Sequence, residues 1–151
     1  MTVERALVHA RPCTIWNTNF AGMKWDKWDP DVEAVEDVKG DMENGSSLVF
    51  VMNDNSGKYK TILSDVVKNE RFTFSGSLMG GLLVFKGTFV LTPEGDDKTN
   101  VEYSFSMYGL LGGPVGFLKS KAIEGGCEGG LKNVKEFSEA AEAAMSDSLC
   151  T

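Results

Sequence analysis

The side chains that could carry chemistry in this chain are few, and its only histidine is the first of them. His9 lies in Val3–Ala10, where loose alternation of apolar residues predicts a strand. An imidazole acts as a general base beside a nucleophile or a substrate proton, and the sequence offers no visible serine or cysteine partner. If Ala6 and Val8 face the core, His9 points to solvent, although Leu7 shares its side of the strand. We interpret His9 as a polar residue without a catalytic role.

Tyr103 is the polar residue that the strand pattern places most directly toward the interior. Its hydroxyl could orient the polar end of a bound molecule, or it could bond to a neighbouring backbone group. Tyr59, Asp65 and Asn133 are further candidates, and their orientation depends on register. Cys127 could be a reactive thiol, but no base is near it in the sequence, so we interpret it as a small buried hydrophobic residue. The sequence therefore assigns no catalytic residue.

The acidic stretch between residues 26 and 37 is dense enough to suggest a metal site. Its members are Asp26, Asp29, Asp31, Glu33, Glu36 and Asp37. A strand points successive side chains to opposite faces, so we interpret these carboxylates as a solvated surface. The turn at residues 53–57 has a calcium-loop composition, but Ser64 stands where the closing glutamate would be. The glycine pairs lack the Gly-Lys-Ser/Thr ending of a phosphate loop, so we expect neither a metal nor another cofactor.

Length and charge exclude several classes of protein. The chain has 151 residues, of which 42% are hydrophobic, and this suits one domain with a real core. The net charge is −7, from 15 basic and 22 acidic residues, and no polybasic run occurs. We therefore expect no nucleic-acid partner and no anionic membrane surface. No apolar run could span a bilayer, and the first residues lack the apolar core of a signal peptide, so we expect no membrane insertion.

The three cysteines, Cys13, Cys127 and Cys150, are far apart and include no C-x-x-C pair. We expect three free thiols, and hence a reducing, cytoplasmic setting. Nothing in the composition indicates a linker or a second domain. We expect one ligand-binding domain over residues 3–145 and a flexible tail over residues 146–151.

Hydrophobic periodicity predicts an α+β fold. Strands are expected at residues 3–10, 32–38, 47–52, 58–67, 72–78, 83–92 and 101–107, and the last three alternate cleanly between apolar and polar residues. Two short helices are expected after the first strand, one of them at about residues 13–19. Alternation over consecutive strands joined by tight turns indicates an antiparallel sheet of about seven strands with one dry face.

The segment Pro114–Met145 is the one best suited to a single long helix, and Pro114 fits its first turn. Ile123, Cys127, Val134, Phe137, Ala141 and Met145 fall on one side of it, and Lys121, Glu124, Glu128, Lys132, Lys135, Glu139 and Glu142 on the other. Gly126 and Gly130 lie within the apolar side, although each interior glycine costs a helix about 1 kcal/mol relative to alanine. A buried helix face left bare at its middle predicts a space between the helix and its cover.

A curved sheet wrapped around this helix would bury both apolar faces and enclose a cavity, the alternative being a filled core. The predicted lining is Phe72, Phe74, Leu83, Phe85, Phe89, Val101, Tyr103, Phe105 and Met107 from the sheet, with Ile123, Gly126, Cys127 and Gly130 from the helix. Trp25 and Trp28 could gate the mouth of the cavity. We expect them instead to pack the short helices onto the rim of the sheet.

The pattern resembles a known superfamily. The pieces are Ala10-Arg11-Pro12, Ile15-Trp16, Trp25-x-x-Trp28-x-Pro30, Gly45 before a strand and the glycine-rich last helix. Their joint order, over roughly residues 3 to 145, resembles the START-like helix-grip (SRPBCC) superfamily. Within it, the chain looks most like the polyketide cyclase/dehydrase and lipid-transport branch, relatives of the plant pollen-allergen fold. The resemblance implies a hydrophobic ligand cavity between sheet and helix, but no single activity, because members include carriers, cyclases and regulatory receptors.

Three functions follow as hypotheses. The first is binding or carrying a hydrophobic small molecule, which could be a lipid, a polyketide or an aromatic compound. The second is a cyclase/dehydrase-type enzyme acting on a polyketide-like or aromatic substrate, which needs an acid or base in the cavity. The third is an interaction or co-chaperone module, which needs a large exposed apolar patch. Because only Tyr103 can be assigned to the cavity face, the sequence favours binding. It specifies neither the ligand nor a protein partner.

Overall fold

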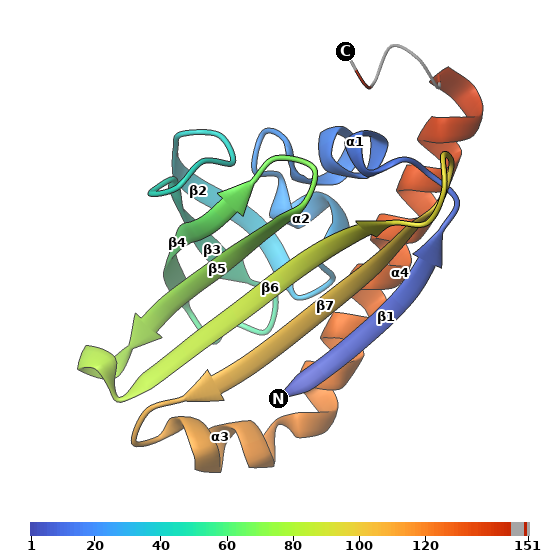
Figure 1. Ribbon diagram of the computed structural model, residues 1–151. Helices are drawn as coiled ribbons and strands as arrows, with labels where there is room; N and C mark the ends of the chain where they lie inside the picture. The colour runs from blue at the N-terminus through green and yellow to red at the C-terminus, as the bar shows by residue number, and fades with distance from the viewer. Residues whose placement is uncertain (146–149, 151) are drawn as a thin grey trace.

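The computed structural model describes residues 1–145 and Cys150. A seven-stranded sheet curves around one long helix, and all neighbouring strands are antiparallel (Figure 1). The strands are β1 (Thr2–Val8), β2 (Val32–Lys39), β3 (Ser47–Met52), β4 (Lys58–Val67), β5 (Arg71–Leu78), β6 (Leu83–Pro93) and β7 (Thr99–Tyr108). Their order across the sheet is β1-β7-β6-β5-β4-β3-β2. The α+β helix-grip architecture is therefore confirmed.

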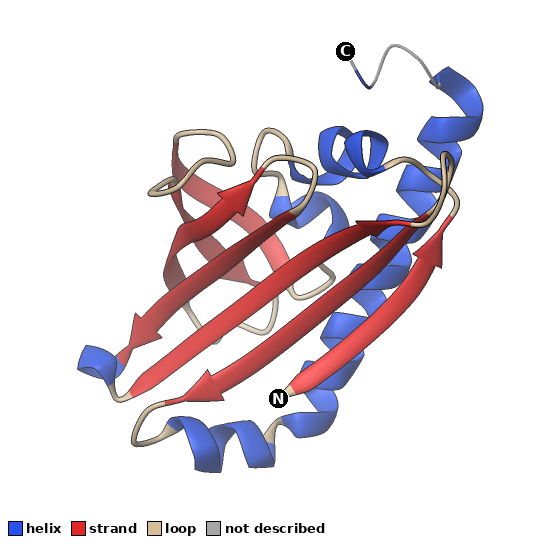
Figure 2. Cartoon of the chain, in the orientation of Figure 1, coloured by secondary structure: helices blue, strands red, loops and turns tan. Residues whose placement is uncertain are grey.

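Short helical segments connect β1 to β2, as predicted. They are α1 (Pro12–Ile15), the π-helical turn η1 (Trp16–Phe20) and α2 (Trp25–Trp28), and a 3₁₀ turn, η2 (Met79–Gly81), joins β5 to β6 (Figure 2). Pro12 stands at the start of α1, where its missing N–H costs nothing. His9 is exposed while Val8 and Ala10 are fully buried, so the side chain of His9, whose face the sequence left open, points away from the core.

The terminal helix is divided, and this corrects the prediction of one helix over Pro114–Met145. Helix α3 (Gly112–Leu118) ends at Lys119, and α4 (Ser120–Met145) begins after it. The apolar side of α4 starts only at Ile123, so no continuous buried stripe holds the two segments in line. Phe117 and Leu118 of α3 are exposed. Helix α4 alone crosses the concave face of the sheet (Figure 1).

One end of the interior is filled by aromatic side chains. Trp25 and Trp28 are fully buried, and their rings contact Phe72, Phe89 and Phe20 at centroid distances of 5.3 to 5.8 Å. The two tryptophans thus pack the short helices onto the sheet as predicted, but against the central strands β5 and β6 instead of the rim. Burying an aromatic side chain contributes about 1.5–3 kcal/mol to stability, so this cluster is a substantial part of the hydrophobic core.

Two glycines in the sheet make room for the rings on its concave face. A Cβ atom at Gly87 would collide with the ring of Phe74, its partner in the β5–β6 register. A Cβ atom at Gly76 would collide in the same way with Phe85, the residue opposite it. Because glycine has no side chain, each phenylalanine lies flat across the neighbouring strand. The rings therefore lie against the sheet.

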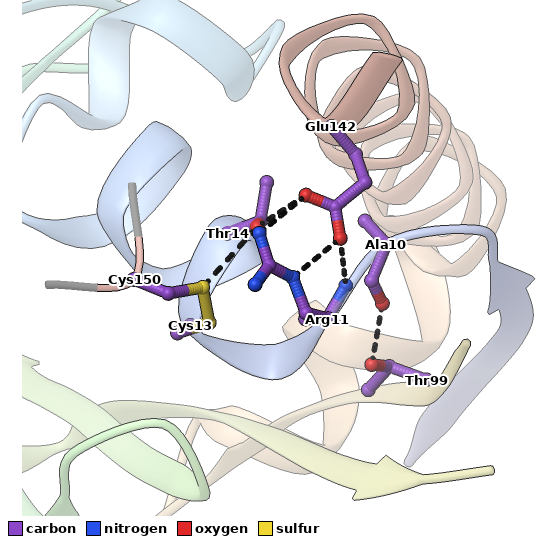
Figure 3. A network of polar contacts seen from close by, with 7 residues as sticks. All are labelled: Ala10, Arg11, Cys13, Thr14, Thr99, Glu142 and Cys150. Carbon is purple, nitrogen blue, oxygen red and sulfur yellow. Dashed lines mark hydrogen bonds and ion pairs between the residues drawn. A yellow bond between two sulfur atoms is a disulfide. The ribbon is translucent and has the colours of Figure 1, made fainter. Parts of the chain in front are cut away.

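A polar network fastens the C-terminal part of α4 to the β1–α1 segment (Figure 3). Glu142 accepts hydrogen bonds from the backbone N–H and guanidinium of Arg11 and from the Thr14 hydroxyl, at 2.8 to 3.2 Å. These contacts hold the pKa of Glu142 below its usual value. The Thr99 hydroxyl donates to the Ala10 carbonyl at 2.7 Å nearby.

A disulfide joins Cys13 to Cys150 beside this network, which corrects the prediction of three free thiols (Figure 3). Only Cys127 is free among the described cysteines. The two bonded cysteines are 137 positions apart in sequence, and spacing alone does not reveal that α1 meets the end of the chain. The cysteine argument for a reducing setting therefore no longer holds. Apart from Cys150, the predicted flexible tail lies outside the described residues, as does the side chain of Met145. No described helix is long and apolar enough to cross a membrane.

Candidate functional site

A cavity of about 180 Å³ lies between the concave face of the sheet and the first half of α4. Its apolar and aromatic wall is formed by Val32, Phe50, Met52, Tyr59, Phe74, Phe85, Phe105, Met107, Ala122 and Ile123. Its polar end is formed by Asp29, Asp31, Asp54, Ser56, Tyr103, Lys119 and Cys127, with Gly126 at the helix surface. An apolar wall with a small number of polar groups at one end is the usual construction of a small-molecule site.

The cavity contains most of the lining residues expected from the sequence, but not all. Phe74, Phe85, Tyr103, Phe105, Met107, Ile123, Gly126 and Cys127 line it, whereas Phe72, Leu83, Phe89, Val101 and Gly130 do not. Trp25 and Trp28 account for much of the difference, because they fill the interior at the end that holds Phe72 and Phe89. The open space therefore occupies only the end of the sheet farther from α1.

Gly130 is not bare, and this corrects the idea that it leaves space for a ligand. A Cβ atom there would lie 3.3 Å from Cζ3 of Trp28, tighter than ordinary van der Waals contact. The space beside Gly126 is also occupied, since a Cβ atom there would collide with Oδ2 of Asp31. The first glycine admits a tryptophan ring to the core, and the second admits a carboxylate to the cavity rim. Both glycines permit close approach to α4.

The residues missed by the sequence come mainly from β3, β4 and the segment after α2. Phe50 and Tyr59 line the cavity because the sheet curves, which brings β3 and β4 over the first half of α4. Asp29 and Asp31 were interpreted as part of a solvated surface. That prediction is wrong for Asp29, which directly follows the buried Trp28 and is carried inward with it, whereas Asp31 is exposed at the rim of the cavity. Adjacency to a buried tryptophan was the available signal.

The Asp29–Pro30–Asp31 segment is anchored from two sides. The Asn133 side chain of α4 donates to the Trp28 carbonyl at 2.9 Å, directly before the segment. Asn53, in the turn between β3 and β4, donates its side-chain amide to the Pro30 carbonyl at 2.5 Å and its backbone N–H to the Asp31 carbonyl at 3.0 Å. Fixed carbonyls leave the carboxyl groups little freedom to move away from the cavity. Asp65, another register-dependent candidate, is exposed and pairs with Arg71 at 3.1 Å.

Asp29 has the electrostatics of a group that exchanges a proton near neutral pH. Burial raises its pKa from 3.8 to about 7, the hydrogen bond from the Asp31 N–H at 2.9 Å opposes this, and the charge of Asp31 adds to it. The pKa of Asp31 is also raised, first by burial and then by the charge of Asp54. A carboxyl group near half-protonation can give or take a proton with little free-energy cost.

Tyr103 and Cys127 form the neutral part of the polar end. The buried phenol of Tyr103 has its pKa raised well above 10 by desolvation and by the charge of Asp29, and it shares a hydrogen bond with Cys127. Burial raises the pKa of the Cys127 thiol to about 12, so it stays protonated and is a poor nucleophile. Tyr103 thus offers a fixed hydroxyl, while Cys127 behaves as the small buried residue that the sequence indicated.

The cavity opens to solvent at a mouth formed by exposed residues, among them Asp54, Ser56, Lys119 and Ala122. Hydrogen bonds from Ser56 hold the pKa of Asp54 below its usual value. Across the described residues, no group of three or more His, Cys, Asp or Glu side chains converges as a metal site would require. Close to the mouth, α3 and the loop before it expose Leu110, Phe117 and Leu118, the feature on which the interaction-module alternative rests.

Comparison with known proteins gives a family match over most of the chain. A model of the family described as polyketide cyclase / dehydrase and lipid transport matches residues 2–139. Comparison with curated proteins gave no match.

Solved structures share the fold at low sequence identity. XoxI from Bacillus cereus has a TM-score of 0.70 and 13% identity, with 92% of this chain and 96% of that chain covered. A hypothetical protein from Helicobacter pylori has a TM-score of 0.74 and 10% identity, with 90% and 86% covered. The di-domain ARO/CYC BexL from the BE-7585A biosynthetic pathway has a TM-score of 0.68 and 14% identity, covering 91% of this chain and 46% of that one. At such identities the likeness establishes the fold alone.

Proposed function

Because the chain belongs to the polyketide cyclase/dehydrase and lipid transport family, we propose that it binds or carries a hydrophobic small molecule in the cavity between sheet and α4. The observation that carries the proposal is the cavity itself. A well-packed domain of this size has few voids larger than a water molecule, whereas this one keeps about 180 Å³ open beside six phenylalanine and tyrosine rings, those of Phe50, Tyr59, Phe74, Phe85, Tyr103 and Phe105.

The size of the cavity narrows the ligand class. Sites for drug-sized ligands usually enclose about 300–1,000 Å³, and an apolar cavity of about 150 Å³ is enough for benzene. The volume here therefore favours a compound of one or two rings over a long-chain lipid or a large polycycle.

An environment-sensitive apolar dye tests this function directly. We expect saturable dye fluorescence with the folded protein, reversed by naphthalene-sized competitors. Ile123→Phe should fill the cavity and weaken dye binding at least about tenfold, because Ile123 lines it. Ile62→Phe is the matched control, since Ile62 is exposed on β4 and lies outside the cavity. Unsaturable fluorescence, or equal loss in both variants, would contradict the proposal.

Asp29 supports a second candidate function, catalysis of the cyclase/dehydrase type. An enzyme of that type needs an acid or base against the substrate, and Asp29 combines a cavity position with a pKa of about 7. In its ionised form the carboxylate could take a proton from a carbon beside a carbonyl group. In its neutral form it could give a proton to a departing hydroxyl group. The fixed hydroxyl of Tyr103 would orient the substrate.

Turnover of a small poly-β-ketone analogue, followed by mass spectrometry, separates the two candidates. If the protein is an enzyme, Asp29→Asn should lower turnover by about 10²-fold or more while dye affinity stays within about threefold of wild type. If wild-type protein binds the analogue and returns it unchanged, the carrier function stands and the catalytic one is excluded for that substrate class.

A further inference from the structure

The polar end of the cavity has more acidic side chains than basic ones. Asp29, Asp31 and Asp54 line it, and Lys119 is the single basic residue of the described lining. Among the ion pairs of the described residues, none involves Asp29 or Asp31. Lys119 acts on Asp54, whose pKa is lowered mainly by Ser56 and to a lesser extent by the lysine charge. Asp29, which is partly buried, and Asp31, which is exposed at the rim, therefore line the cavity without an ion-pair partner among the described residues.

Their placement is built into the fold. Oδ1 of Asp29 accepts the Asp31 N–H at 2.9 Å, and no hydrogen bond within the described part of the chain reaches its Oδ2. Oδ2 of Asp31 lies against Gly126, where any larger residue would push the carboxylate away. Holding a carboxyl group in a half-buried position without a cation costs free energy, so a partner supplied from outside would remove an existing penalty.

The walls of the cavity add to the preference for positive charge. Phe85 and Phe105 stack with their ring centroids 6.5 Å apart and their planes inclined by 12°, and the Tyr59 ring lies 6.0 Å from Phe85. The face of an aromatic ring is electron-rich and attracts a cation placed over it. An anion in the same space would be repelled by the electron-rich ring faces and by the negatively charged carboxylates.

We infer that the cavity selects a small aromatic amine, a compound of one or two rings whose ammonium group meets Asp29 and Asp31 and whose rings lie against Phe85 and Phe105. This inference rests on the proposed function, because it requires that the cavity binds a ligand. It excludes fatty acids and aromatic carboxylates as preferred ligands. The neutral hydroxyl of Tyr103 stands at the same end and can accept a further hydrogen bond from the ammonium group.

Three probes with one ring system and different polar groups test the inference: 1-naphthylmethylamine, 1-naphthalenemethanol and 1-naphthoic acid. The affinity of each is measured from its displacement of the apolar dye from wild-type protein at about pH 8, where Asp29, with a pKa of about 7, is mostly ionised. We expect the amine to bind at least about tenfold tighter than the acid, with the alcohol between them.

Two isosteric variants locate the preference. Asp29→Asn and Asp31→Asn should each reduce the amine-to-acid affinity ratio at least about threefold, while affinity for the alcohol stays within about twofold. Asp26→Asn is the control, because Asp26 is exposed on α2 and lies outside the lining. It should leave the ratio unchanged.

The outcomes separate the inference from the proposed function. If the acid binds as tightly as the amine, or if neither Asp29→Asn nor Asp31→Asn changes the ratio, the inference is overturned while ligand binding stands. If the dye and all three probes fail to bind, the proposed function fails first. Should Asp29→Asn not fold, the exposed carboxylate of Asp31 still supplies the test.

Discussion

Single residues in this protein take their properties from what surrounds them, and the acidic stretch shows it most clearly. Asp26 is exposed, whereas Asp29, three positions later, lines the cavity with its pKa raised to about 7. The two residues belong to the same acidic stretch, and the sequence pattern does not distinguish them. The difference arises because Trp28 is drawn into the core and brings the next residue with it.

The raised pKa of Asp29 makes stability depend on pH in a direction that can be measured. Well below pH 3.8, the usual pKa of this carboxyl group, it is protonated in both states, so it contributes nothing to the difference. Between about pH 4 and 7 the unfolded chain loses the proton first, so the free energy of unfolding falls as pH rises. Asp29→Asn removes this effect. We expect the variant to gain roughly 1–3 kcal/mol relative to wild type between about pH 5 and 8 in urea melts. A constant difference across that range would contradict the pKa.

Gly130 gives a second prediction, with a sign opposite to the one that an open space would give. Gly130→Leu should lower the free energy of unfolding by about 1–3 kcal/mol, because its Cβ meets the Trp28 ring at 3.3 Å. Gly125→Leu is the matched control. Gly125 has nothing within 4 Å of a Cβ position, so the same change should gain about 0.5–1 kcal/mol of helix propensity. A stable Gly130→Leu protein in thermal melts would show that Trp28 can move aside.

The elements follow the sequence closely where periodicity is strong and depart from it where packing decides. β3 and β4 begin and end at the residues that alternation and turn chemistry indicate, Ser47–Met52 and Lys58–Val67. The last helix departs from the prediction, because helix propensity does not show that the chain changes direction at Lys119, between α3 and α4. The lining differs for a related reason: alternation shows which face of a strand is dry, but not which part of that face a buried tryptophan fills.

The glycine at the centre of β6 gives a prediction at the scale of the sheet. Gly87→Val should force the Phe74 ring off the strand and into the cavity, costing about 1–3 kcal/mol and weakening dye binding. Thr88→Val is the control, since Thr88 points to the other face, where its hydroxyl meets that of Thr73. Unchanged stability and dye binding in Gly87→Val would mean that the ring has room elsewhere.

At the scale of the whole molecule, the end of the fold distant from the cavity is held together by polar contacts and a disulfide. At about 1.5 Å of rise per residue, Glu142 lies about 22 Å further along α4 than Cys127 of the cavity. The far end is held by the Glu142 network and the disulfide between Cys13 and Cys150. The family and the helix-grip fold could be predicted from element order, but a covalent link across 137 positions could not.

Reduction of the disulfide gives the last prediction. Cys150→Ser should lower the free energy of unfolding by about 2–4 kcal/mol, because the link restricts the unfolded chain. Dye affinity should stay within about twofold, since the disulfide lies far from the cavity along α4. Cys127→Ser is the contrasting variant, because Cys127 lines the cavity and is buried. Equal melting of reduced and oxidised wild-type protein would contradict the expected role of the disulfide.

The division between a filled end and a hollow end also bears on how such a chain can change over generations. Trp25 and Trp28 pack with Phe20, Phe72 and Phe89 into a buried aromatic cluster, and these five residues lie outside the lining. Substitutions at Met52, Met107 or Ile123 alter the shape of the cavity without reaching that cluster. New ligand preferences can therefore arise from single mutations that leave the fold above its stability threshold. A scaffold arranged in this way can change the shape of its cavity while its architecture stays constant.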